Sequence, residues 1–104
     1  MFPKDEPQAR AMMEKVAGAA KCGSFEYFNH TSNSWKYTCQ QGERDFTLIT
    51  ASSKETLDEL SGKLRADGFA CITKSTYIVV APKDTGGLKI PGGYSSPEWL
   101  TPFE

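Results

Sequence analysis

The most reactive side chains of this chain are its single histidine, His30, and its three cysteines, Cys22, Cys39 and Cys71. A cysteine nucleophile requires a nearby base, and Cys39 with His30 would supply that pair, with Asp45 to orient the imidazole. The same cysteines and histidine have the ligand types of a zinc site. They lack the short Cys-x-x-Cys spacing by which one turn presents two ligands. His30 lies in the polar stretch NHTSNS, which is typical of a solvated turn. We therefore expect no catalytic residue, no metal and no cofactor, and keep a small enzyme with a Cys39/His30 centre as a third alternative.

The cysteines also bear on the compartment. An odd number of them leaves one without a disulfide partner, and no secretory leader opens the sequence. These features predict a cytoplasmic protein whose cysteines are all reduced and free of metal. No apolar run approaches the ~20 residues that a membrane span requires, so we expect no contact with a membrane.

The charges of the chain are balanced, with 12 Lys and Arg residues against 13 Asp and Glu residues. Duplex DNA binding normally depends on an excess of basic side chains that neutralise phosphates, and no such excess is present. The glycine pairs of DTGGLKIPGG do not match a phosphate-binding loop. The composition therefore excludes a general electrostatic role, although a local basic patch would still be compatible with it.

Two segments have the periodicity of helices. The first covers residues 5–23, with Pro7 suited to its first turn and Gly23 to its end. The second covers residues 54–67, with Ser52 and Glu55 as a capping box. Each has one apolar stripe. The stripes consist of Ala9, Met12, Met13, Val16, Ala17 and Ala20 in the first helix, and of Leu57, Leu60 and Leu64 in the second.

The segments between and after these helices predict strands. Aromatic or alternating runs occupy residues 24–30, 34–41 and 45–51, and two more strand-like runs occupy 69–73 and 76–82. Short polar loops join the first three, which predicts an antiparallel meander followed, after the second helix, by a hairpin. The predicted fold class is α+β: one small domain over residues 1–85, in which both helices pack on one face of a single sheet. An irregular tail over residues 86–104 follows.

Helix, three-stranded meander and helix is also the element order of double-stranded RNA-binding domains, a resemblance of topology alone. The second helix begins SSKETLDELSGK, which is acidic in its first two turns where that family presents a lysine cluster. A different nucleic-acid hypothesis uses an open aromatic sheet face to stack single-stranded RNA or DNA. Its residues are Tyr27, Trp35, Lys36, Tyr37 and Arg44. The competing interpretation is that these aromatic rings pack under the helices.

The tail is rich in glycine and proline, which prevent a long helix or a central strand. It nevertheless carries large apolar side chains, and disordered tails are usually poor in aromatic residues. We therefore expect the tail to dock, either on its own domain or on another protein or a second copy. The predicted protein-binding residues are Tyr94, Trp99, Leu100 and Phe103.

Together these features predict a non-catalytic module that binds another protein or itself. A small modulator or inhibitor of a host protein fits, as found among accessory proteins of phages and mobile elements. Binding of RNA or single-stranded DNA by the aromatic sheet face is the main alternative.

Overall fold

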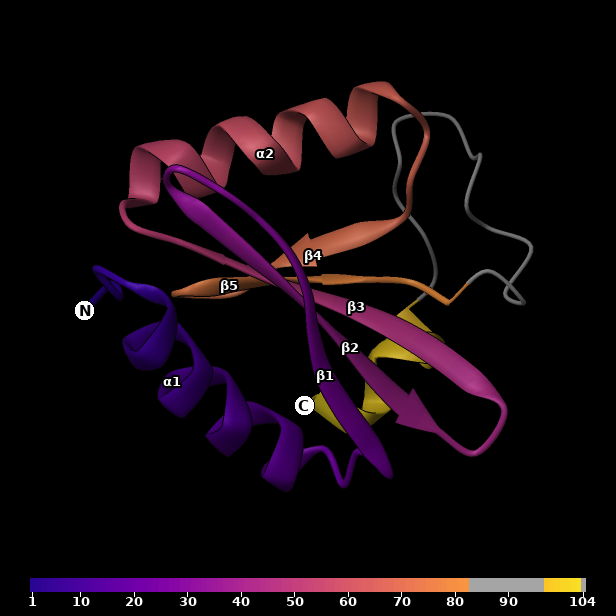
Figure 1. Cartoon of the computed structure of the whole chain (residues 1–104). Coiled ribbons are helices and arrows are strands. Elements are labelled where there is room, and N and C mark those ends of the chain that lie inside the picture. Colours follow the sequence, from indigo (N-terminus) through magenta and orange to yellow (C-terminus); the bar gives the residue numbers. More distant parts are fainter. Residues whose placement is uncertain (83–96, 104) are drawn as a thin grey trace.

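The computed structural model describes residues 1–82 and 97–103 (Figure 1). Its two helices and one five-stranded antiparallel sheet confirm the predicted α+β class and the order of the elements. The strands lie in the order β1-β2-β3-β5-β4, which places β3 at the centre of the sheet. The strand bounds are β1 Ser24–Thr31, β2 Ser34–Gln41, β3 Arg44–Ala51, β4 Cys71–Thr73 and β5 Tyr77–Val80.

Helix α1, Glu6–Ala19, begins where the sequence favours it. The carboxylate of Asp5 accepts a hydrogen bond from the backbone N–H of Gln8 at 3.0 Å and so caps the first turn. The helix ends earlier than predicted, because Lys21 adopts a left-handed conformation, with φ at 59°. Lysine here takes the place that glycine often fills after a helix.

Helix α2, Lys54–Ala66, is capped by Ser53, whose Oγ accepts from the backbone N–H of Thr56 at 3.2 Å. The predicted capping box of Ser52 and Glu55 is therefore wrong by one residue. Both serines precede the same apolar stripe, and only the backbone conformation decides which of them points its hydroxyl at the helix end.

The two helices cover opposite faces of the sheet, and the prediction that both pack on one face is wrong (Figure 1). The reason lies in β3, which is apolar on both faces. Phe46 and Leu48 face the cluster that includes α1, whereas Ile49 and Ala51 face the cluster that includes Leu57 of α2. A central strand buried on both sides needs a cover on each of them.

The C-terminal end of the chain completes the cover on the α1 face. Residues Pro97–Phe103 form a 3₁₀ helix, η3. Leu100 and Phe103 are buried in the same cluster as Met13 and Leu48. Part of the predicted tail therefore belongs to the core of the domain.

Within residues 1–82 and 97–103, no helix is long and apolar enough to cross a membrane.

Candidate functional site

The structure separates the proposed Cys39/His30 pair. In the β1–β2 hairpin, Cys39 lies opposite Phe25 and His30 lies opposite Trp35. The two positions are roughly 15 Å apart along the strands, given the rise of an extended chain. Cys39 is also fully buried, so a base at His30 cannot reach its sulfur.

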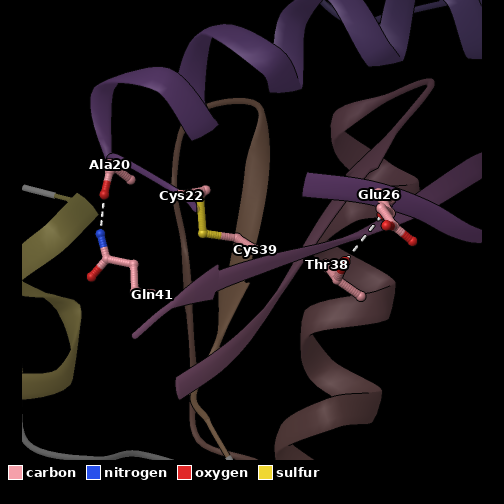
Figure 2. Close-up of a disulfide and its surroundings, with 6 residues drawn as sticks. All are labelled: Ala20, Cys22, Glu26, Thr38, Cys39 and Gln41. Carbon is pink, nitrogen blue, oxygen red and sulfur yellow. Dashed lines mark hydrogen bonds between the residues drawn. A yellow bond between two sulfur atoms is a disulfide. The ribbon is translucent and has the colours of Figure 1, made fainter. Parts of the chain in front are cut away.

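Cys39 forms a disulfide with Cys22, and the prediction that all three cysteines are reduced is wrong for these two (Figure 2). Their Cα atoms lie 5.3 Å apart although 17 residues separate them in sequence. The turn after α1 brings Cys22 beside β2, where the backbone N–H of Gly23 donates to the carbonyl of Gln40. Cys71 is a free thiol buried in the cluster on the α2 face, away from the other two.

The predicted nucleic-acid residues do not form one surface. Trp35 and Tyr37 are only 4% and 0% exposed, since both lie in the core cluster on the α1 face. Tyr27 packs at the edge of that cluster, whereas Lys36 alternates to the other face of β2. Buried rings cannot stack on bases, so this set does not provide the platform that the alternative requires.

The buried aromatic residues instead join α1 to the sheet. The hydroxyl of Tyr37 donates to Oε2 of Glu6 at 2.9 Å, and the same oxygen lies 3.1 Å from Nε of Arg10. The Arg10 guanidinium lies 5.9 Å from the ring centres of both Tyr27 and Tyr37. Burial, with the Glu6 carboxylate adding to it, raises the pKa of Tyr37 above its usual value. This network stabilises the fold and keeps Tyr37 protonated.

Of the predicted protein-binding residues of the tail, two are buried in the domain and two have side chains outside the described part of the chain. Leu100 is 6% exposed, and the ring of Phe103, 8% exposed, packs edge-on against Phe46 with their centres 4.9 Å apart. These two side chains are therefore anchored on their own domain. Tyr94 and the side chain of Trp99 lie outside the described part of the chain, so their predicted role stays a prediction.

One surface of the sheet stands out by what lines it. The α2 face of β1 and β2 carries polar side chains, and among the described elements no helix covers it. A concavity of about 500 Å³ opens there, extending from the start of β1 to Phe69, in the link between α2 and β4. Its polar lining is Ser24, Glu26, Thr38, Gln40, Glu43, Asp45 and Thr47. The apolar residues at its border are Phe46, Phe69, Val80 and Ala81, of which Phe46 and Ala81 belong to the cluster on the α1 face. We call this surface the open-face concavity.

The open-face concavity has a distinct chemistry. It contains three carboxylates, those of Glu26, Glu43 and Asp45, and among the described residues that line it there is no lysine, arginine or histidine. Apolar side chains such as Phe69 lie next to these acids. The surface suits a ligand that presents positive charge beside apolar groups.

Sequence reasoning did not find this surface. The alternation in β2 does separate Lys36, Thr38 and Gln40 from the buried Trp35, Tyr37 and Cys39, which indicates one polar face. Nothing in that alternation shows that Phe69, distant in sequence, closes one side of a concavity over it.

Comparison of the chain with protein-family models, with curated proteins and with solved structures found no match.

Proposed function

We propose that this domain binds another protein, and that the partner docks on the open-face concavity. The observation that carries the proposal is the contrast between the two halves of the α2 face. Helix α2 covers Ile49 and Ile78 on one half, whereas the other half presents polar side chains, bordered by apolar residues, around a hollow of about 500 Å³.

The charges of the concavity favour a particular kind of partner. Glu26, Glu43 and Asp45 repel phosphate groups, so this surface disfavours RNA or DNA, which depend on basic side chains for affinity. They attract lysine and arginine, and the apolar residues that border the concavity provide contact for the stems of these side chains. The partner we propose is a protein segment that carries basic and apolar residues together.

The proposed role is binding without catalysis. The described polar residues that line the concavity provide carboxylates, hydroxyls and one amide, and none of them is a cysteine or histidine. A domain that binds in this way acts by occupying the surface of its partner, as a modulator or inhibitor does.

The test is a titration of isotope-labelled protein followed by backbone amide NMR. The probe is a short peptide that alternates lysine and leucine, with a matched peptide in which glutamate replaces lysine and a poly-dT oligonucleotide as the two comparisons. We expect the lysine peptide to shift amides of residues 24–26, 38–47, 69 and 80–81. The Glu26→Gln/Asp45→Asn variant should bind it roughly fivefold more weakly, since two exposed ion pairs contribute about 1 kcal/mol.

The matched control is Glu14→Gln/Glu59→Gln, which removes two exposed carboxylates from the helices and leaves the concavity intact. This variant should bind the lysine peptide as the parent protein does. Equal weakening by both variants would show that only net charge matters. Shifts caused by the oligonucleotide, or by the acidic peptide in preference to the basic one, would contradict the proposal.

A further inference from the structure

The Cys22–Cys39 disulfide lies at a junction between two parts of the fold. It ties the turn that follows α1, at the start of β1, to the end of β2 (Figure 2). Two hydrogen bonds reinforce the same junction: Nε2 of Gln41 donates to the carbonyl of Ala20, and the backbone N–H of Gly23 donates to that of Gln40. The unit formed by α1 and β1 is therefore fastened to the rest of the domain at this point.

Besides the pairing of β1 with β2 and the contacts of Glu6 and Arg10 with Tyr37, most of the apolar side chains that hold this unit are small or only partly buried. The fully buried residues of α1 are Ala9, Met13 and Ala17, so two of the three contribute only a methyl group each. Among the described strands, β1 lies at the edge of the sheet and pairs only with β2, and it is exposed over its last four residues. Segments with few buried apolar contacts are those that open first in native proteins.

We propose that the Cys22–Cys39 disulfide is a thiol-sensitive latch, whose reduction loosens the α1–β1 unit while the rest of the domain stays folded. The reductant is a small thiol of the glutathione class. Its thiolate attacks the sulfur of Cys22, because Cys22 is partly buried whereas Cys39 is fully buried. The disulfide breaks, and the Cys39 sulfur leaves with the electron pair and takes up a proton. A second small thiolate then attacks the small-thiol sulfur of the mixed disulfide, and the Cys22 sulfur leaves with the electron pair and takes up a proton. Two small thiols are thereby oxidised to one small disulfide, and the protein gains two thiols.

Opening the latch has a defined consequence for the surface. In α1, Glu6 accepts a hydrogen bond from the Tyr37 hydroxyl and Arg10 lies over the Tyr37 ring. Trp35 is buried beside Tyr37 in the core cluster on the α1 face. Movement of the α1–β1 unit exposes this aromatic face, which lies on the side of the sheet opposite to α2. Glutathione keeps cytosolic thiols reduced, so the latch is open in the cytosol and closed in an oxidising compartment.

The test is amide hydrogen exchange of the full chain, followed by mass spectrometry, with the disulfide closed and after reduction by glutathione. We expect exchange over residues 6–31 to accelerate on the order of 100-fold, the effect of removing a cross-link over a loop of this length. Exchange over α2 and β5 should stay unchanged. Alkylation of the oxidised protein after denaturation should label one cysteine, Cys71, and reduction should make all three available.

The Cys71→Ala variant is the control, since it leaves the latch intact and should respond to glutathione as the parent protein does. The Cys22→Ser/Cys39→Ser variant should exchange like the reduced protein and ignore glutathione. If that variant does not fold, circular dichroism of the reduced parent protein decides instead. The proposal is overturned if reduction accelerates amide exchange equally in every segment, unfolds the whole protein or leaves exchange unchanged. It is also overturned if all three thiols are free under oxidising conditions.

Discussion

Tyr37 is the residue through which the sheet and α1 are joined. Its ring stacks on Phe25 with the centres 5.1 Å apart, and its hydroxyl donates to the Glu6 carboxylate. Burial comes first and the Glu6 carboxylate second among the causes that raise the Tyr37 pKa. Burial alone also raises the pKa of Tyr77. Both phenols therefore keep their protons at a pH where free tyrosine loses them.

These pKa shifts predict a loss of stability at alkaline pH. An unfolded tyrosine ionises near pH 10. Above that pH the unfolded chain releases protons that the folded protein retains at Tyr37 and Tyr77. The free energy of unfolding therefore falls as pH rises, and each of the two tyrosines contributes up to about 1.4 kcal/mol for each pH unit. Below about pH 10 the contribution is fully present.

Urea unfolding at a series of pH values, from neutral to strongly alkaline, checks this loss of stability. The proteins compared are the parent, Tyr37→Phe and Tyr77→Phe. The Tyr37→Phe variant should lose about 1 kcal/mol at neutral pH, because the hydrogen bond to Glu6 is gone. Its stability should then fall less steeply than that of the parent above pH 10. If the free energy of unfolding falls with pH equally steeply in all three proteins, neither phenol causes the alkaline loss of stability.

At the scale of elements, η3 decides what the predicted tail does. The sequence left open whether its apolar residues pack on their own domain or on a partner. Leu100 and Phe103 pack on the domain, next to Phe46 and on the same face as α1. Pro82, the last described residue before η3, is also fully buried.

The burial of Phe103 predicts that its truncation destabilises the domain. Phe103→Ala should lower the free energy of unfolding by about 3–5 kcal/mol, as for other buried phenylalanines. Phe28→Ala is the matched control: Phe28 is 52% exposed on β1, and its loss should cost no more than about 0.5 kcal/mol. Thermal or urea unfolding measures both. A cost for Phe103→Ala as small as that of Phe28→Ala would mean that η3 does not contribute to the core in solution.

At the scale of the whole molecule, the central strand organises the two layers of helix. Neighbouring residues of β3 point to opposite faces: Leu48 faces the cluster with α1, and Ile49 faces the cluster with α2. Each is almost fully buried. Among the described elements no helix covers the part of the α2 face next to β1 and β2, where the open-face concavity lies.

This arrangement predicts that Leu48→Ala and Ile49→Ala cost similar amounts, each about 2–5 kcal/mol. A sheet covered on one face would bury only one of two neighbouring residues, and truncating the other would cost little. The unfolding free energies of the two variants, measured under the same conditions, distinguish these cases. A value near zero for either variant would contradict helices on opposite faces.

Much of the fold follows from local patterns. The apolar stripes of α1 and α2, the alternation in β2 and β3 and the strand-like runs at β1, β4 and β5 predicted these two helices and five strands in the right order. They did so because side-chain direction repeats with the geometry of a helix or a strand, and burial favours sequences that match it. The same alternation correctly places Lys36 and Tyr37 on different faces.

Other features depend on contacts between distant segments. Alternation shows that two residues share a face, but it does not show which helix covers that face, so the placement of α1 and α2 was not predictable. Cys22 and Cys39 meet only because the end of α1 and the register of β1 on β2 bring them together. Phe69 closes the open-face concavity for a similar reason. Periodicity is a local property of the chain, whereas packing partners are set by the whole domain.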